Sequence, residues 1–300
     1  MEVRRLGRSG LELTSIGFGG GPAGWLSAPD ADETALTTID AAWKAGFRYF
    51  DTALFYGYGS SERRLGRYFR GKPREQYVLS SKVGRLIRPK FAGDMSPEQV
   101  VFDYSRDGAL RSIEESLSRL GLDRIDIALI HDIDGWTHGA EQPKRLAEAI
   151  DGAYRTLADI KAQGAIRAIS LGVNEWRVCQ AFAERVPIDC FLLAGRITLL
   201  EHEAEQSFLP FCVERGIGLI IGGHFNSLAG PSTAAFLQPA RWMGRSTTIQ
   251  RRPNISAFGF VVCRQSAPST QSCLRPQHSP IPCASLRSQL SSQAWRAWWK

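Results

Sequence analysis

Four side chains that could move protons follow apolar segments in the first half of this 300-residue chain. Asp51 and Tyr56 follow one apolar segment, Lys82 ends the next, and His131 ends a third. A phenol with a pKa of about 10 is a poor acid at neutral pH unless a neighbouring ammonium stabilises its phenolate. Lys82 could supply that charge, and Asp51 could pair with Lys82 and fix its position. Together the four residue types indicate proton transfer.

These residues need a scaffold that brings the ends of separate apolar segments together. From residue 13 to residue 227, short apolar runs alternate with polar loops and with stretches of helical period. Strands that are apolar on both faces and separated by helices indicate a parallel sheet covered by helices, and an unbroken repeat favours a closed barrel. The apolar runs are 15–19, 47–53, 77–83, 125–131, 166–173, 190–195 and 217–223, and the helix-like segments are 34–45, 113–120 and 146–160.

The predicted fold is therefore α/β, a (β/α)8 TIM barrel. An N-terminal β-hairpin over residues 3–17 is expected to lie on one end of it, because the pattern alternates around the turn pair Ser9-Gly10. In such a barrel the C-terminal ends of the strands meet at one mouth. A single Asp at a strand end is more often a cap or an ion-pair partner, and a single His is more often a core residue. Their occurrence at successive strand ends favours a reactive site.

The motifs around these residues resemble the aldo-keto reductases. They are FDTALFYGYGSSERRLG (50–66), LSSKVGR (79–85), LIHDID (129–134) and LGVN (171–174), and the resemblance spans roughly residues 3–227. Within that family, IHDIDGWTHG (130–139), AGRITLLE (194–201) and GGHFNS (222–227) are similar to the branch of D-threo-aldose 1-dehydrogenases and L-fucose dehydrogenases, to which pyridoxal 4-dehydrogenases are related.

The resemblance implies a role for each member of the proton-transfer set. Tyr56 would be the general acid/base, Lys82 would depress its pKa, Asp51 would hold Lys82, and His131 would orient the carbonyl or hydroxyl of the substrate. The implied reaction is hydride transfer between a nicotinamide and an aldose C1 or a small aldehyde or alcohol. Two tryptophans and a histidine are left open, because they either line the substrate pocket or merely pack. They are Trp25, Trp136 and His138.

The resemblance also implies a cofactor, NADP or NAD, and no metal. A glycine turn at the end of the first run would let the backbone approach the mouth, an asparagine after the fifth run would bind the nicotinamide carboxamide, and the loop after the seventh run would lie along the pyrophosphate. The expected cofactor-binding residues are Gly20, Asn174, Arg196, Gly222, Gly223, Phe225, Asn226 and Ser227.

Charge is distributed unevenly along the chain. The whole sequence has 37 Lys+Arg and 30 Asp+Glu, a net charge of +7, but residues 228–300 hold nine basic and no acidic residues. The remainder has 37 − 9 = 28 basic residues and therefore a charge of 28 − 30 = −2. No apolar run approaches the roughly 20 residues of a membrane helix, and the start has no signal-peptide core. The six cysteines form no CxxC pair, so we expect a cytoplasmic protein.

The sequence pattern and composition of residues 228–300 differ from those of residues 1–227, which are expected to form the barrel. The family's eighth strand, its end motif and the following phosphate-gripping helix have no counterpart there, and 255–263 is the single candidate for a strand. The segment is rich in Arg, Ser, Pro and Gln, so we expect little order in it. Our hypothesis is that it is translated out of frame from about residue 228. Reading the nucleotide sequence in the two other frames tests this.

Two alternatives to an active reductase remain open at this stage. If the C-terminal cofactor site is lost, the chain could be a catalytically impaired relic or a non-catalytic binding subunit. Alternatively, the basic segment with its tryptophans could act as a nucleic-acid or anionic-surface arm. A nicotinamide-binding measurement distinguishes the first alternative from an active reductase, because absence of binding would favour the relic or binding subunit. We favour the reductase, with a small carbonyl or sugar substrate, no nucleic-acid partner and no membrane association. The oligomeric state leaves no pattern in the sequence.

Overall fold

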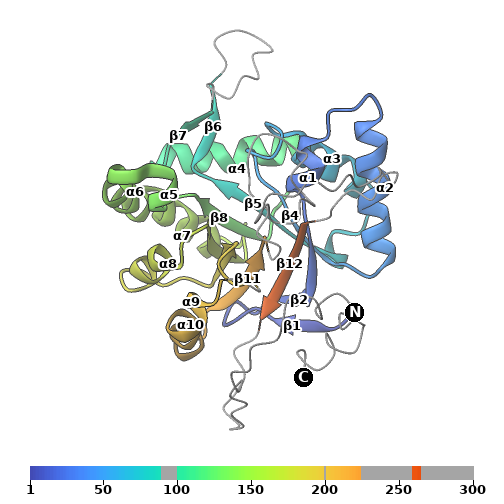
Figure 1. The fold of residues 1–300 in the computed structure, drawn as a ribbon. Helices are drawn as coiled ribbons and strands as arrows, with labels where there is room; N and C mark the ends of the chain where they lie inside the picture. The colour runs from blue at the N-terminus through green and yellow to red at the C-terminus, as the bar shows by residue number, and fades with distance from the viewer. Residues whose placement is uncertain (89–99, 199–200, 224–258, 265–300) are drawn as a thin grey trace, which may run out of the picture. The chain divides into compact units, whose positions relative to one another are not determined.

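The computed structural model describes residues 1–88, 100–198, 201–223 and 259–264. Its centre is a closed barrel in which seven strands run parallel and follow one another in chain order (Figure 1). The parallel strands are β3 (Ile16–Gly19), β4 (Tyr49–Asp51), β5 (Val78–Val83), β8 (Ile127–His131), β9 (Ala168–Val173), β10 (Cys190–Ala194) and β11 (Gly218–Gly222). The predicted α/β barrel and the seven predicted strand segments are thereby confirmed.

The eighth position of the barrel is filled by a strand that runs the other way. β12 (Gly259–Arg264) pairs antiparallel with β11 on one side and with β3 on the other. β12 overlaps the predicted strand candidate 255–263. The eighth strand was expected to be missing or replaced, and in the structure a strand of reversed direction replaces it. The rest of residues 228–300 lies outside the described residues, and so does the expectation of low order there.

Helices cover the outside of the parallel strands (Figure 1). The three predicted helical segments overlap helices of the structure. Ser105 begins the long helix α4 by accepting a hydrogen bond from the Gly108 amide, and Gly121 ends it in the left-handed region. The α-helices are α1 (Gly21–Trp25), α2 (Ala31–Lys44), α3 (Ser60–Phe69), α4 (Arg106–Leu120), α5 (Gly135–His138), α6 (Gln142–Glu148), α7 (Arg155–Ala162), α8 (Trp176–Ala183), α9 (Glu203–Gln206) and α10 (Phe208–Arg215). Short turns of other helix types are η1 (Arg74–Gln76), η3 (Gly139–Glu141) and the π-helical η4 (Ala149–Tyr154).

Two hairpins complete the fold. The predicted N-terminal hairpin consists of β1 (Val3–Arg5) and β2 (Glu12–Thr14), and its buried leucines pack against residues at the N-terminal ends of the barrel strands. It therefore closes the end of the barrel opposite the mouth. The second hairpin, β6 (Arg85–Ile87) with β7 (Val100–Phe102), follows the end of β5 and was not predicted.

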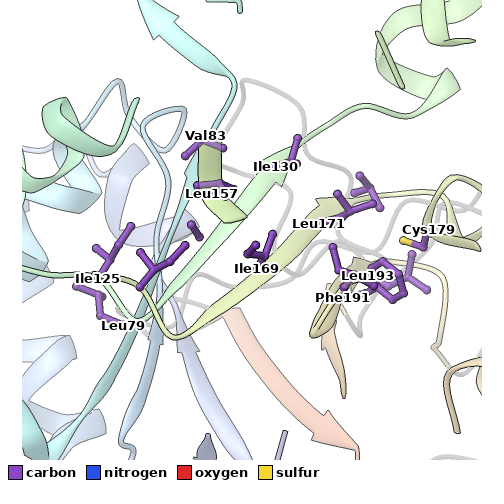
Figure 2. Close-up of a cluster of buried hydrophobic side chains, with 14 of the residues drawn as sticks. Leu79, Val83, Ile125, Ile130, Leu157, Ile169, Leu171, Cys179, Phe191 and Leu193 are labelled. Carbon is purple, nitrogen blue, oxygen red and sulfur yellow. The ribbon is translucent and has the colours of Figure 1, made fainter. Parts of the chain in front are cut away.

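The core has an inner and an outer layer, because successive side chains of a strand point to opposite faces. On β8, Ile127 and Leu129 belong to the cluster inside the barrel, whereas Ala128 and Ile130 belong to the cluster under the helices. Figure 2 shows part of the outer cluster, which includes Ile130, Leu157 and Ile169. This double burial explains why the strands read as continuous apolar runs.

Candidate functional site

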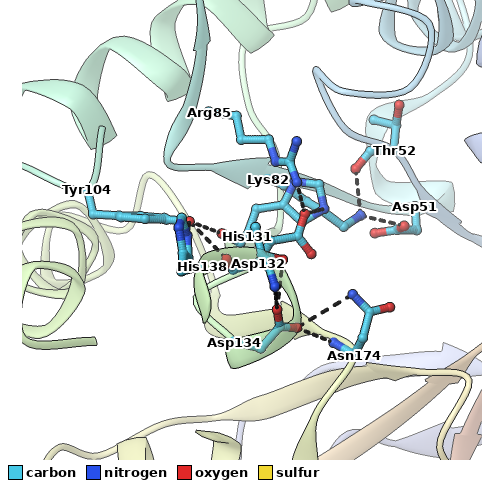
Figure 3. Close-up of polar contacts among 11 residues, drawn as sticks. Asp51, Thr52, Lys82, Arg85, Tyr104, His131, Asp132, Asp134, His138 and Asn174 are labelled. Atoms are coloured by element: carbon cyan, nitrogen blue, oxygen red, sulfur yellow. Dashed lines mark hydrogen bonds and ion pairs between the residues drawn. The ribbon is translucent and has the colours of Figure 1, made fainter. Parts of the chain in front are cut away.

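The strand order brings three of the four proton-transfer residues to adjacent strand ends. Asp51 ends β4, Lys82 lies near the end of β5, and His131 ends β8, and these strands are neighbours in the barrel (Figure 3). Tyr56 follows in the loop after β4 and is half-buried. The structure therefore places the four residues at one mouth.

Lys82 and Asp51 form a buried ion pair at the base of the mouth. Lys82 Nζ lies 2.7 Å from Asp51 Oδ2 and donates a second hydrogen bond of 2.9 Å to the Thr52 carbonyl oxygen. Ser80 Oγ donates to Asp51 Oδ1 at 2.7 Å, so both carboxylate oxygens are satisfied. The two side chains are 2 % and 4 % exposed. Burial opposes the charge on Lys82, but attraction to Asp51 and Tyr56 outweighs it, and the pKa of Lys82 lies above its ordinary value.

Lys82 lies beneath the ring of Tyr56, with Nζ 4.9 Å from the ring centroid. The ring of His131 stands perpendicular to that of Tyr56, with centroids 6.4 Å apart. Burial raises the pKa of Tyr56 above its ordinary value, while the charge of Lys82 acts in the opposite direction. The expected depression by Lys82 is therefore present but smaller than the effect of burial. Tyr56 is a neutral phenol at neutral pH in this structure.

The loop that carries Tyr56 is held against α1 by two glycines that the sequence analysis did not single out. Gly57 has φ +62, and a Cβ there would overlap the Gly24 carbonyl group. A Cβ on Gly24 would likewise overlap the backbone of Tyr56. This close approach fixes the position of the phenol. The sequence signal for Gly57 was the YGYG segment, in which a glycine follows each tyrosine.

His131 is buried and held in its neutral form. Burial is the main reason that its pKa lies well below the ordinary value, and the nearby charges of Arg85 and Lys82 act in the same direction. A neutral imidazole carries one N–H and can donate one hydrogen bond to a substrate oxygen. His131 can therefore donate a hydrogen bond at the mouth while it remains uncharged.

A second group of polar residues lies around His131, and three of its members, Arg85, Tyr104 and Asp132, were not predicted as site residues. Asp132 pairs with Arg85 of β6, and the hydroxyl of Tyr104 donates to the carbonyl oxygens of His131 and Asp132 at 2.7 and 3.1 Å (Figure 3). Tyr104 also lies 3.0 Å from His138 Nε2, so His138 packs rather than projecting freely into the mouth. The signal for Asp132 was its place directly after His131 in the LIHDID motif.

Four of the expected cofactor residues come together on the other side of the mouth. The backbone N–H of Asn174 donates to Asp134 Oδ2 at 2.7 Å, and Arg196 Nε donates to the Asn174 carbonyl oxygen at 2.7 Å. Gly222, next to Gly223, accepts a hydrogen bond of 2.9 Å from the Gly195 amide and so joins the ends of β10 and β11. Phe225, Asn226 and Ser227 lie outside the described residues.

Gly20, another of the expected cofactor-binding residues, is required by the packing of the strand ends. Its N–H donates to the Asp51 carbonyl oxygen at 2.7 Å, and a Cβ at this position would lie 2.7 Å from that oxygen and overlap Ser61 Oγ. The glycine thus permits the end of β3 to approach β4. Of the two tryptophans left open, Trp25 packs edge-on against Phe55, with ring centroids 5.9 Å apart, and Trp136 is 74 % exposed.

Within the described ranges, no group of three or more His, Cys, Asp or Glu side chains is arranged to hold a metal ion. In the same part of the chain, no helix is long and apolar enough to cross a membrane.

Comparison with known proteins identifies the family. The model of the aldo/keto reductase family matches residues 15–247. Pyridoxal 4-dehydrogenase from Microbacterium luteolum is 41 % identical over 251 residues, which cover 77 % of this chain and 73 % of that protein. D-threo-aldose 1-dehydrogenase from a Pseudomonas species is 35 % identical over 236 residues, covering 73 % and 68 %.

A solved structure, the holo form of an aldo-keto reductase from Bacillus halodurans, has a similar fold. Its TM-score is 0.60 at 24 % identity, and the match covers 74 % of this chain and 65 % of that one, which is less than two thirds of its length. This likeness concerns the fold alone. With the family model matching most of the chain and two curated relatives sharing more than a third of their aligned residues, the chain belongs to the aldo-keto reductase family of oxidoreductases.

Proposed function

We propose that this chain transfers a hydride between a nicotinamide cofactor and C1 of an aldose, or the carbonyl carbon of a small aldehyde, with Tyr56 as the general acid/base. The observation that carries the proposal is the buried Lys82–Asp51 pair beneath the ring of Tyr56. Burying an ammonium is costly even when it is paired, and here the Lys82 ammonium lies against the ring of Tyr56, a phenol at the mouth that can exchange a proton with a substrate. The relatives named pyridoxal 4-dehydrogenase and D-threo-aldose 1-dehydrogenase support an aldehyde or sugar substrate.

The residues present fit the nicotinamide part of NAD or NADP. The side-chain oxygen of Asn174 has no partner among the described residues, and its amide nitrogen lies 3.5 Å from Asp134 Oδ2, so the carboxamide can pair with another carboxamide. Arg196 adds a positive charge beside it, and Gly222 and Gly223 leave the end of β11 without bulky side chains. When bound, the nicotinamide would accept or donate the hydride.

In the oxidative direction the sugar loses one hydride and one proton. The C1–H bond breaks and its electron pair leaves with the hydride, while the anomeric O–H gives its proton to the Tyr56 phenolate, so that C1–O becomes a carbonyl and the product is a lactone. His131 donates a hydrogen bond to the same oxygen and holds it in place. Reduction of an aldehyde uses the same groups in reverse, with Tyr56 as a neutral phenol that gives up its proton.

The direction of the reaction should depend on pH. Burial raises the pKa of Tyr56, so the neutral phenol needed for reduction is the main form at neutral pH. Oxidation needs the phenolate, and its rate should rise as the pH increases toward that pKa. Initial rates in both directions across the alkaline range check this expectation.

The proposal is tested by mixing the full chain with L-fucose or pyridoxal and either NAD+ or NADP+, and by following the absorbance of the reduced nicotinamide. We expect oxidation of at least one substrate and a loss of about 10²–10⁴ in kcat for Tyr56→Phe. Tyr68→Phe is the matched control, because Tyr68 lies on α3 and bonds to Asp40 away from the mouth. Nicotinamide fluorescence measures cofactor binding separately. Absence of both binding and turnover would favour the impaired relic or binding subunit.

A further inference from the structure

A carboxylate lies beside His131 at the point where the proposed function places the reacting oxygen. Asp132 Oδ2 is 3.3 Å from His131 Nε2, and the same oxygen forms the ion pair with Arg85. Asp132 Oδ1 has no partner among the described residues, although the side chain is only 11 % exposed. Oδ1 is not one of the buried atoms that lack a partner, so it is an acceptor open to solvent and available to a ligand.

The backbone holds this carboxylate in an uncommon conformation. Asp132 has φ +51, in the left-handed region that a non-glycine residue seldom occupies. Its N–H donates to the Gly172 carbonyl oxygen at 2.9 Å, and Tyr104 donates to the carbonyl groups on both sides of the bend. Such conformations cost energy and persist at sites where a side chain has to be aimed. Here the bend directs the Asp132 carboxylate toward the His131 ring.

The partner of Asp132 is fixed as well. The Arg85 guanidinium lies 4.1 Å from the ring centroid of Phe55 and 4.6 Å from that of Phe102. Phe55 belongs to the loop that carries Tyr56, and Phe102 belongs to β7. Arg85 therefore links the β6–β7 hairpin to the Tyr56 loop and holds one oxygen of Asp132, which leaves the other oxygen available to a ligand.

We propose that Asp132 is a specificity-determining residue that accepts a hydrogen bond from a hydroxyl on the carbon next to the reacting carbon, which is C2 in an aldose. This inference rests on the proposed function. A substrate oxygen bonded to His131 Nε2 would lie about 2.9 Å from it. Oxygens on adjacent sugar carbons are about one hydrogen-bond length apart, so the neighbouring hydroxyl would come within reach of the Asp132 carboxylate, which lies beside His131 Nε2.

An ionised carboxylate accepts hydrogen bonds and cannot donate them, which selects a hydroxyl over a hydrogen atom at that carbon. Burial raises the pKa of Asp132 to about 6, while Arg85 on β6 and Lys82 on β5 lower it and Asp134 in the following loop raises it. The acceptor is therefore ionised at neutral pH. Its preference for a hydroxylated substrate should weaken as the pH falls through about 6.

The test compares kcat/KM for L-fucose and 2-deoxy-L-fucose at mildly alkaline pH. A hydrogen bond to a charged group predicts at least about a tenfold preference of the wild-type chain for L-fucose. Asp132→Asn should reduce that preference to within about threefold, because a neutral amide is a weaker acceptor and can instead donate. Asp159→Asn is the matched control, since Asp159 is an exposed residue of α7 that pairs with Arg106, and it should keep the wild-type preference.

Two results would overturn the inference while leaving the proposed function intact: equal use of both sugars by the wild-type chain, or an unchanged preference in Asp132→Asn. If Asp132→Asn does not fold, the wild-type preference measured against pH decides, because it must decline through about pH 6. In Arg85→Gln that decline should move to higher pH, since the cation that lowers the pKa of Asp132 is gone. A chain that oxidises neither sugar would overturn the proposed function and this inference together.

Discussion

The two sides of the barrel mouth are held together by different forces. On the side of β4, β5 and β8, side chains form a connected set of buried contacts that begins with the Lys82–Asp51 pair and continues to Ser80. On the side of β11, β12 and β3, the strands are joined by antiparallel backbone pairing through β12. The first side specifies its own geometry by charge and hydrogen bonds. The second depends on a strand whose sequence departs from the preceding repeats.

The difference bears on the origin of residues 228–300. Seven successive units place a parallel strand in the barrel, and an eighth unit of the same kind would do so again. β12 instead runs antiparallel, so it starts beside Gly19 at the mouth and ends away from it. We propose, as the composition suggests, that this part of the chain is read out of frame. The proposal is wrong if neither alternative frame encodes a parallel eighth strand followed by an amphipathic helix.

Removing one member of the buried pair should have the largest effect. Lys82→Met leaves the Asp51 carboxylate buried without its cation, and we expect a loss of about 3–5 kcal/mol in the free energy of unfolding. Asp51→Asn combined with Lys82→Met removes both charges and should recover most of that stability without recovering turnover. Urea unfolding and steady-state assays measure the two effects. A double variant as unstable as the single one would contradict this account.

Breaking the backbone pairing of β12 should have the next largest effect. Val261 pairs with Gly17 of β3, and its neighbour Val262 pairs with Ile221 of β11, so the strand has a partner on both sides. Val261→Pro removes an N–H from this ladder and should lower the unfolding free energy by about 2–3 kcal/mol. Val261→Ala keeps the N–H and serves as the control. Equal stability of the two variants would show that β12 does not support the barrel.

The loop of Tyr56 can be displaced without touching the buried pair. Gly57→Ala places a methyl group against the Gly24 carbonyl, whereas Gly71→Ala meets nothing within 4 Å, although both glycines have positive φ. Both variants incur a backbone cost of about 1–2 kcal/mol, and only the first adds an overlap. We expect Gly57→Ala to lose more stability and at least about tenfold in kcat/KM. Retention of full activity would show that this glycine contact does not position Tyr56.

One substitution at the mouth should instead increase stability. The pKa of Asp132 is higher in the folded chain, at about 6, than its ordinary value of 3.8. The folded state therefore binds this proton more tightly, and the resulting stability, present below about pH 4, is lost as the pH rises through about 6. Asp132→Asn avoids that loss and should be more stable than the wild-type chain by on the order of 3 kcal/mol at neutral pH. The difference should vanish in acid, which thermal unfolding across pH would measure.

The sequence predicted most of the fold and the central residues of the site for a common reason. Strands buried on both faces leave continuous apolar runs, and the residues that end them, Asp51 and His131, are visible as the first polar positions. Arg85 and Tyr104 were not found, because they reach the site from the β6–β7 hairpin and from the loop between β7 and α4 rather than from a barrel strand. Their roles depend on distances across the chain that no local pattern records.

The amino-acid pattern alone determined the repeat of strand and helix, the order of the reactive residues and the uneven distribution of charge, because each of these is set by local spacing and composition. The tertiary structure decided which groups are buried together. It raised the pKa of Tyr56 by burial despite the nearby Lys82, it placed Asp132 against His131 through a left-handed bend, and it filled the eighth position with a reversed strand. Burial and electrostatic coupling act between residues far apart in the chain, so they appear only once the barrel has closed.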